Sequence, residues 1–331
     1  MEQLFIDRKG ASLDVEAGRL LVRIPDERPI SLPLRQLQIV AISASVQLSS
    51  RLLLAFDKAA ITLTLVNPRQ TGEWLVVNGN RHGHVARRVG QYQLCQEEGW
   101  MLDAARQIVL VKIRSHYRAL LRYRRQRADL RYVLTGALRQ LRERYSSALA
   151  ATSIETLRGV EGAAAAAYFP ALAAMFAPHW QFERRARRPP PDPVNALLSL
   201  GYSLIYGEAV RALVACGLDP AIGCLHDIAY QRESLACDLV ELLRADVDAW
   251  VVSLLRSESL RPTHFSRSEG NSCMLNKEGR ELFYPLYQAQ AHEWRRYLRR
   301  IAMQWARKVL ADIRVDDGPV LLVAGETDGE G

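Results

Sequence analysis

Two carboxylates three residues apart mark the stretch of this chain that is best suited to chemistry. Asp238 and Glu241 lie in the segment SLACDLVELLR, residues 234–244, and His226 precedes it. In a helix this spacing places both carboxylates on one face, where like charges repel each other. We therefore expect a positive charge over them. We also expect that removing one carboxylate holds or raises the stability of the metal-free protein.

A third carboxylate completes a candidate metal site. Glu161 lies between Gly159 and Gly162 at the start of an apolar segment. An imidazole and carboxylates that converge from separate helices suit a divalent cation such as Mn²⁺ or Mg²⁺. Each residue also has a simpler explanation. Glu161 can be an acid that the dipole stabilises near a helix N-terminus, and His226 can be a hydrogen-bonded core residue.

A zinc site is the competing interpretation of the same region. Cys224, His226 and Cys237 lie close together in the sequence. Structural zinc sites usually show paired cysteine or histidine knuckles, which this stretch lacks. The pattern therefore favours small buried hydrophobic cysteines over zinc ligands.

Composition indicates a soluble globular protein that contacts a polyanion. The chain has 331 residues, 49% of them hydrophobic, and a net charge of +8 from 44 basic and 36 acidic residues. This length allows two domains, and clustered arginines favour nucleic-acid contact. Five cysteines without a disulfide pattern and an N-terminus unlike a signal peptide predict a cytoplasmic protein. The longest apolar runs, such as 194–206, look too short to cross a membrane.

The pattern along the chain predicts an α+β fold with a small N-terminal β domain followed by a larger all-α helical catalytic domain. In the β-rich part, residues 1–80, we expect one helix at 45–58 and strands at 3–7, 19–24, 37–42, 61–67 and 73–78. Helical spacing dominates residues 81–315. Residues 316–331, rich in Gly, Asp and Glu, are expected to form a mobile tail.

Capping signals predict where three helices of the second part begin. Thr152 to Glu155 has the pattern of a capping box, Asp192 precedes a proline suited to a first turn, and Ser234 can cap the helix that carries Asp238. Residues 196–214 are apolar on all sides, which is typical of the buried centre of a helical bundle.

Basic residues gather in three tracts, at 106–144, at 184–188 and at 295–308. A solvated helix face explains most such runs. The second tract is a short loop that leads into prolines, so its arginines are predicted to contact phosphates; they are Arg184, Arg185, Arg187 and Arg188.

Five motifs, in order, resemble those of the CRISPR-associated adaptation integrases, the family of the first Cas protein ("Cas-one"). They are LRGVEG at 157–162 with Tyr168 and Phe169, RPPPDPVNALLSLGY at 188–202, GCLH at 223–226, SLACDLVELLR at 234–244 and CMLNKEGR at 273–280. The chain departs from the family pattern at Ala245, where proline is usual, and at Cys224 and Cys237, where apolar residues are usual.

The resemblance assigns roles to individual residues. It implies that Glu161, His226 and Glu241 hold Mg²⁺ or Mn²⁺. Asp238 is implied as an adjacent polar partner in the catalytic set. Asn195, which would line the site, and Arg244 join the four loop arginines as predicted DNA-binding residues.

The resemblance also implies an activity and partners. The family inserts short double-stranded DNA into the repeat of a CRISPR array, as part of antiviral defence, by direct attack of 3′-OH ends. A homodimer formed through the β domain and a small bridging protein ("Cas-two") are implied. A structure-selective metal-dependent nuclease and a non-catalytic DNA-binding subunit remain the alternatives. Joining of DNA ends separates the integrase from the nuclease, and metal-dependent turnover separates it from the binding subunit.

Overall fold

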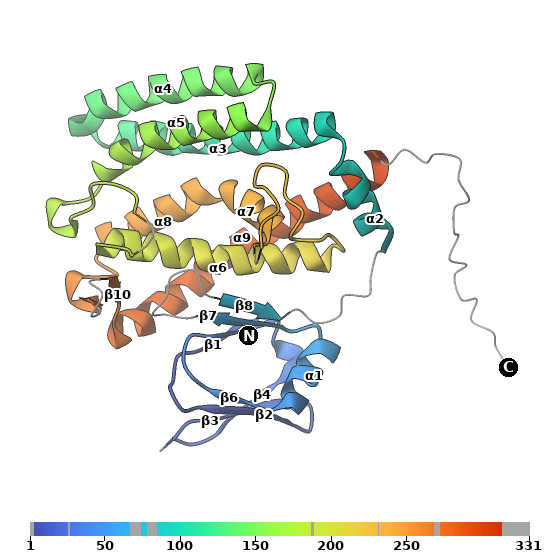
Figure 1. The fold of residues 1–331 in the computed structure, drawn as a ribbon. Coiled ribbons are helices and arrows are strands. Elements are labelled where there is room, and N and C mark those ends of the chain that lie inside the picture. The colour runs from blue at the N-terminus through green and yellow to red at the C-terminus, as the bar shows by residue number, and fades with distance from the viewer. Residues whose placement is uncertain are drawn as a thin grey trace, which may run out of the picture.

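The chain folds into an N-terminal β-sheet region followed by a mostly helical region, as the sequence predicts (Figure 1). The computed structural model describes residues 3–25, 27–66, 74–77, 85–186, 189–230, 232–267 and 272–312. The predicted tail at 316–331 lies outside these residues. The last described strand of the first region ends at Val77 and the first helix of the second region begins at Val85.

The β region consists of two four-stranded sheets. The first has the order β1 (Gln3–Ile6), β5 (Ile39–Ile42), β7 (Thr62–Val66), β8 (Trp74–Val77), and only β8 runs antiparallel to its neighbour. The second has the order β4 (Ile30–Pro33), β3 (Arg19–Arg23), β2 (Ser12–Glu16), β6 (Gln47–Leu48). The β2–β3 hairpin turns at Ala17 and Gly18, which both have positive φ, as a tight hairpin turn requires.

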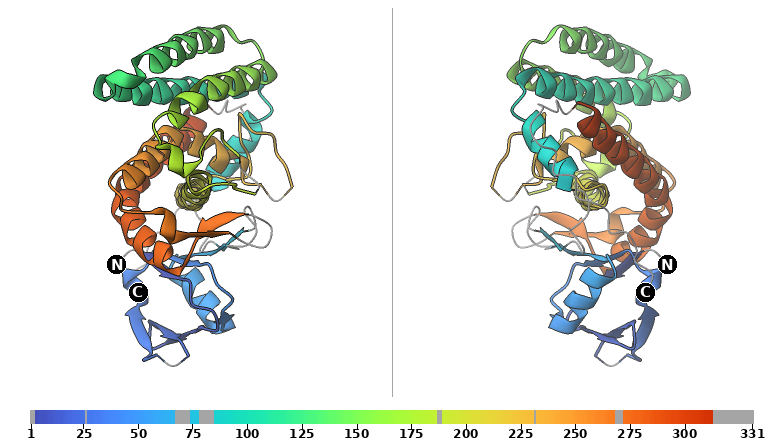
Figure 2. Two further views of the ribbon diagram at one scale, coloured as in Figure 1. Left: turned by 90° about the vertical axis from the view of Figure 1, so that its left-hand side faces the viewer. Right: turned by 90° about the vertical axis from the view of Figure 1, so that its right-hand side faces the viewer.

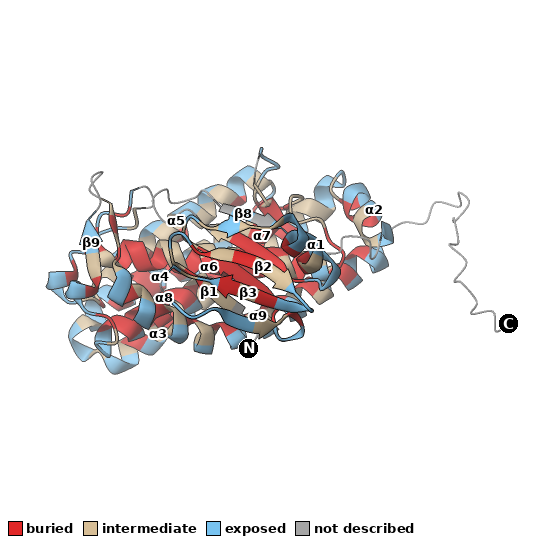
Figure 3. Ribbon diagram, turned by 90° about the horizontal axis from the view of Figure 1, so that it is seen from below, coloured by how far each residue is buried: buried red, intermediate tan, exposed pale blue. Residues whose placement is uncertain are grey.

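Apolar side chains of both sheets and of helix α1 (Ser50–Lys58) form one core. Leu13 and Leu20 come from the second sheet, Val40 and Leu63 from the first, and Phe56 from α1. Figure 3 shows this region from below, with buried positions along β2 and β3.

The sequence predicted this region only in part. Helix α1 begins at Ser50 and not at residue 45, because Gln47 and Leu48 pair with β2 and Ser49 caps the helix by accepting a hydrogen bond from the Leu52 amide at 3.1 Å. Strands β2, β4 and β6 were not predicted. Strands β1, β3 and β5 lie within the expected segments but are one or two residues shorter, and β7 and β8 also lie within theirs.

The helical region has two layers (Figure 1). Helices α3 (Glu98–Gln126), α4 (Arg131–Ala150) and α5 (Ile154–Ala173) pack together in one layer. The other layer holds α6 (Pro193–Ala215), α7 (Ser234–Glu241), α8 (Arg244–Arg256) and α9 (Lys277–Asp312), and α2 (Val85–Leu94) packs on α9. A hairpin of β9 (Phe265–Arg267) and β10 (Cys273–Leu275) precedes α9. Short 3₁₀ turns lie at Leu34–Gln36, Ala128–Leu130, Pro178–Trp180 and Pro262–His264.

The capping predictions have mixed outcomes. Asp192 caps α6 through a 2.8 Å bond from the Asn195 amide, as predicted. Helix α5 is capped one residue later than predicted, since Ser153 accepts a bond from the Thr156 amide. The prediction for Ser234 was wrong: it is the first helical residue of α7, and its hydroxyl donates to the Asp227 carbonyl instead.

Helix α6 forms the centre of the helical region, as its apolar sequence predicts. Figure 2 shows it nearly end on, with other helices around it, and it packs against α7, α8 and α9. The expectation that no apolar run is long enough to cross a membrane was wrong, because the helix continues past Tyr206 to Ala215. Among the described residues, α6 alone reaches the length and apolar composition of a spanning helix, and 67% of its apolar window is buried inside the protein.

Contacts from α6 and α9 join the helical region to the first sheet. Phe5 of β1 stacks on Tyr284 of α9 with ring centroids 4.3 Å apart, and Arg280 forms an ion pair with Asp7 at 3.4 Å. Arg211 of α6 donates to the Gln38 side chain at 3.1 Å, just before β5. The sheet is therefore fixed against the same two helices that build the helical core.

We predict opposite outcomes for alanine at the two glycines of α6. A Cβ on Gly201 would lie 2.9 Å from Val247 Cγ1 of α8, whereas a Cβ on Gly207 would meet Thr64 no closer than 3.8 Å. Gly201→Ala should therefore destabilise the protein by about 1–3 kcal/mol. Gly207→Ala should be neutral or stabilise it by up to about 1 kcal/mol, because alanine is the better helix former. Urea unfolding of both variants measures this, and equal stabilities would contradict the close approach.

Candidate functional site

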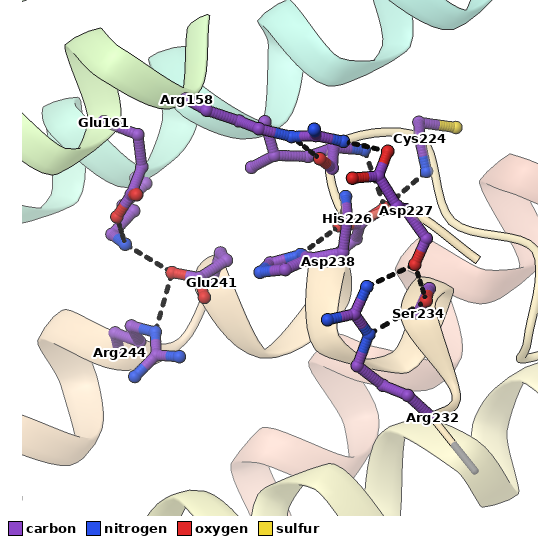
Figure 4. A network of polar contacts seen from close by, with 12 residues as sticks. Arg158, Glu161, Cys224, His226, Asp227, Arg232, Ser234, Asp238, Glu241 and Arg244 are labelled. Atoms are coloured by element: carbon purple, nitrogen blue, oxygen red, sulfur yellow. Dashed lines mark hydrogen bonds and ion pairs between the residues drawn. The ribbon is translucent and has the colours of Figure 1, made fainter. Parts of the chain in front are cut away.

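Two of the predicted ligands meet at a lysine that the sequence analysis did not single out. Glu161 lies in the middle of α5 and Glu241 at the end of α7, and the Lys112 ammonium of α3 donates to Glu161 Oε1 and to Glu241 Oε2. Figure 4 shows the two glutamates approaching from different helices. The mid-helix position of Glu161 excludes the simpler explanation that it is an acid stabilised at a helix N-terminus.

A second cation holds Glu241. The Nε of Arg244, at the start of α8, donates to Glu241 Oε2 at 2.6 Å. Burial raises the pKa of Glu241, but the charges of Arg244 and Lys112 outweigh this effect and leave the pKa well below its ordinary value. The positive charge expected over the carboxylate pair is therefore present at Glu241, one member of the pair. Because removing Glu241 would leave two buried cations without their anion, we now expect lower stability in the metal-free protein, opposite to the expectation from the sequence.

Asp238 positions the loop that carries His226. Its carboxylate is fully buried and accepts backbone amide bonds from Cys224 at 2.6 Å, Leu225 at 3.1 Å and His226 at 3.1 Å. The His226 Nδ1 lies 2.7 Å from Asp238 Oδ1. Since an ionised carboxylate only accepts, Nδ1 carries the proton, and Nε2 of a neutral ring keeps the lone pair that binds a metal. Asp238 is thus a positioning residue for this loop.

The His226 loop is also held at Gly223 and at Leu225. A Cβ on Gly223 would lie 2.7 Å from the backbone carbon of Ser234, so only glycine fits there. Arg158 of α5 donates from Nε to the Leu225 carbonyl at 2.7 Å, next to Asp227 (Figure 4). The sequence suggested that His226 approaches from a helix. It lies instead on a fixed loop.

The donor set suits a hard or borderline divalent ion. Glu161, His226 and Glu241 offer carboxylate oxygens and an imidazole nitrogen, and both carboxylates already converge on one cation. Within the described part of the chain, no three or more His, Cys, Asp and Glu side chains form a group ready to hold a metal ion. The Lys112 ammonium instead lies against both glutamates.

The two cysteines near His226 are poorly suited to zinc. Cys224 is buried and Cys237 is partly buried. Burial raises the pKa of the Cys224 thiol well above its ordinary value and that of Cys237 to about 11. Zinc binds the thiolate form, which burial disfavours here.

The predicted DNA-binding residues fall into different environments. Arg184 is exposed, whereas Arg185 donates to the Asn195 side chain at 2.9 Å and to Ser199 Oγ at 3.0 Å. Asn195 is fully buried and holds the backbone of residues 184 and 186, so it fixes the loop. Its place in the lining of the site stays a prediction. Its predicted DNA contact is not supported by this position. Arg187 and Arg188 lie outside the described residues. Arg244 donates its hydrogen bond to Glu241.

A buried polar cluster lies behind the site. Arg244 lies over the ring of Tyr202 at 4.5 Å, and the Tyr202 hydroxyl donates to Asp248 of α8. His116 of α3 stacks on Tyr168 of α5 with ring centroids 3.8 Å apart. Burial raises the pKa of Asp248 to about 6, even though the Tyr202 hydrogen bond lowers it.

We predict that Asp248 gives the protein a measurable pH dependence of stability. Its folded pKa of about 6 exceeds the ordinary value of 3.8, so the folded state binds the proton more tightly and loses stability as pH rises from about 4 to 6. Asp248→Asn should remove this loss. The difference in free energy of unfolding between Asp248→Asn and the wild type should shift in favour of the variant by up to about 3 kcal/mol from pH 4 to pH 7. Urea unfolding across this range measures it, with the exposed Asp103→Asn as control; parallel pH profiles for Asp248→Asn and the wild type would contradict the raised pKa.

Comparison with known proteins places this chain in a family. The family model described as "CRISPR associated protein Cas1" matches residues 4–289. A protein of Thermodesulfovibrio yellowstonii named "CRISPR-associated endonuclease Cas1 1" is 35% identical over 320 residues, which cover 96% of this chain and 100% of that protein.

Solved structures share the fold. A structure described as "Casposase bound to integration product" matches with a TM-score of 0.81 at 21% identity, covering 95% of this chain and 92% of that one. A chain of the "Cas6-RT-Cas1--Cas2 complex" matches with a TM-score of 0.81 at 22% identity, covering 93% of this chain and 35% of that one. The motifs around Glu161, His226 and Glu241 thus lie in a chain that belongs to the Cas1 family of CRISPR-associated proteins.

Proposed function

We propose that this protein is a metal-dependent integrase that inserts short duplex DNA into a CRISPR repeat. One observation carries the proposal: Glu161 and Glu241, from two helices, reach one cationic centre beside the fixed loop of His226. Family membership supports it, since a relative that this chain matches over its full length is named an endonuclease. The casposase structure, described with an integration product, supports the integrase over a simple nuclease. The cytoplasmic location is part of the proposal.

Glu161, His226 and Glu241 would hold Mg²⁺ or Mn²⁺, which would supply charge to polarise the scissile phosphate and stabilise negative charge as the 3′-OH attacks. The side chains of Glu161 and His226 are partly exposed, at 27% and 32%, so substrate can approach from their side. Asp238 keeps the His226 ring oriented through its Nδ1 contact. Arg244 neutralises Glu241 and fixes its carboxylate.

We assign double-stranded DNA and a small Cas2-type bridging protein as partners. The exposed Arg184, beside the loop that Asn195 fixes, offers its guanidinium to phosphates. A solved structure of similar fold is described as a complex that includes Cas2, which supports the second partner.

We predict that substitution of any ligand abolishes strand transfer. Glu161→Gln, His226→Ala and Glu241→Gln should each lower the rate by about 100-fold or more, because each removes a group that holds the ion near the phosphate. The assay joins short duplex DNA to supercoiled DNA that carries a repeat, with the Cas2-type partner and Mg²⁺ or Mn²⁺. The exposed Glu155→Gln, also on α5, is the control and should keep wild-type activity.

The same assay separates joining from cleavage. Donor DNA with 3′-deoxy ends should give no joined product, because the attacking hydroxyl is missing. A wild-type rate in Glu241→Gln would show that the ligand set is wrong. Cleavage without joining, with both donors, would favour the structure-selective nuclease, and DNA binding without metal-dependent turnover would favour the non-catalytic subunit.

We further propose that the β region forms the homodimer. In the described residues, β8 is an edge strand, and its Leu75 and Val77 are 54% and 41% exposed; Leu54 on α1 is 71% exposed. Exposed strand edges with apolar side chains favour association. Helix α1 and the edge of the first sheet therefore offer the apolar surface that a two-fold contact would cover.

We predict that Leu75→Asp disrupts this dimer. Light scattering of the full chain should give twice the 37.3 kDa of one chain, and Leu75→Asp should shift this toward a monomer because a charge would be buried in the contact. Leu149→Asp, on α4 and equally exposed at 55%, is the matched control and should remain dimeric. A monomeric wild type, or a Leu75→Asp variant that stays dimeric, would contradict the assignment.

A further inference from the structure

Lys112 occupies the position of greatest negative charge in the site. Its ammonium is shared between Glu161 and Glu241, and its side chain is only 5% exposed. The Glu241 side chain is 4% exposed, so the ion pair of Lys112 and Glu241 is removed from water. The Glu161 side chain is 27% exposed. The charge of this buried lysine is stabilised by the two carboxylates and not by water.

The ammonium and a divalent ion would compete for the same two carboxylates. A metal ion bound by both glutamates requires oxygens within about 2.0–2.6 Å of one point. The Lys112 nitrogen takes a hydrogen-bonded place against Glu161 Oε1 and Glu241 Oε2. Repulsion between the ammonium and a divalent cation disfavours the presence of both at these two atoms.

We infer that Lys112 is a displaceable counter-cation that competes with the divalent metal for Glu161 and Glu241. The inference rests on the proposed function, because it takes these glutamates as metal ligands. Without metal, the lysine and Arg244 together balance the two carboxylates, and the lysine keeps α3, α5 and α7 together at the site. Metal binding replaces the two ammonium contacts, so part of its free energy is used to break them.

The side-chain chemistry suits this exchange. Lysine is a compact point charge on a flexible stem, so its ammonium can leave while the helix stays in place. Arg244 keeps its own 2.6 Å contact with Glu241 Oε2, which preserves one cation on that carboxylate. Glu161 is the more exposed of the two glutamates. When the Lys112 ammonium leaves, the Glu161 carboxylate therefore becomes the more accessible of the two.

Two variants should change metal affinity in opposite directions. Lys112→Met keeps most of the length of the side chain and removes the competing charge, so Mn²⁺ should bind about tenfold or more tightly. The metal-free variant should melt at a lower temperature, since two carboxylates then lose their shared cation, and Mn²⁺ should restore its melting temperature more than it raises that of the wild type. Lys112→Arg keeps the charge as a forked donor that pairs more firmly with carboxylates, so Mn²⁺ should bind more weakly.

The experiment is calorimetric titration of the full chain with MnCl₂ alone, at fixed ionic strength and without DNA, combined with thermal melts. Lys277→Met, at an exposed lysine, controls for the loss of one positive charge and should bind Mn²⁺ as the wild type does. Glu161→Gln defines the signal from the site, because it should remove Mn²⁺ binding. If Lys112→Met fails to fold, the Lys112→Arg titration decides alone.

The outcomes separate this inference from the proposed function. Equal or weaker Mn²⁺ binding in Lys112→Met, with a wild type that binds Mn²⁺ through Glu161, overturns the inference and makes the lysine a structural ion pair. Unchanged affinity in Lys112→Arg does the same. Absence of Mn²⁺ binding to the wild type overturns the metal site and the inference with it.

Discussion

The ion pairs of Lys112 are the interaction on which the site depends. They bring together a helix from the first helical layer, the middle of α5 and the end of α7, which are 49 and 129 residues away from the lysine in sequence. Carboxylates in a largely buried site need a cation or several hydrogen-bond donors, because isolated buried charge is strongly unfavourable. The helical layers therefore meet at a point that charge complementarity fixes, while the apolar packing of α6 supplies the rigid support behind it.

The neighbouring carboxylates of α7 are stabilised in two different ways. Asp238 is stabilised by hydrogen bonds from three backbone amides, whereas Glu241 is stabilised by the full charges of Arg244 and Lys112. Backbone donors fix Asp238 permanently, since a folded loop does not release them. Side-chain cations can be exchanged for another cation. This difference explains why Asp238 positions His226, and it supports the proposal that Glu241 holds a metal ion.

Local signals in the sequence predicted much of the fold. The Asp192 cap, the buried character of α6 and the change from strands to helices are all encoded by neighbouring residues, and each is confirmed. The short strand β6 was missed because its two residues are strands only through pairing with β2, which a local pattern does not reveal. Ser234 was misjudged for a similar reason: its hydroxyl found the Asp227 carbonyl in the preceding loop.

The site was predicted from residue types, but its electrostatics were not. The motifs named Glu161, His226, Asp238 and Glu241, yet Lys112 was counted as one member of a basic tract. A signal was present in the sequence, because Lys112 is the single charged residue between Ile108 and Ile113, and a lone lysine in an apolar run indicates a buried charge that needs a partner. Which acid it meets depends on tertiary packing, and no spacing in the sequence encodes that.

The arginine loop illustrates why the number of basic residues is a poor measure of a DNA surface. Arg185 donates hydrogen bonds to the Ala186 carbonyl, Asn195 and Ser199, so its side chain holds the loop together. Arg184 is exposed and keeps its guanidinium available for phosphate. The two arginines are adjacent in sequence and equal in charge, but only the exposed one can exchange water for a phosphate oxygen without breaking protein contacts. The proposed DNA contact therefore depends on which donors remain free after folding, and the buried Asn195 contributes by fixing the loop that presents Arg184.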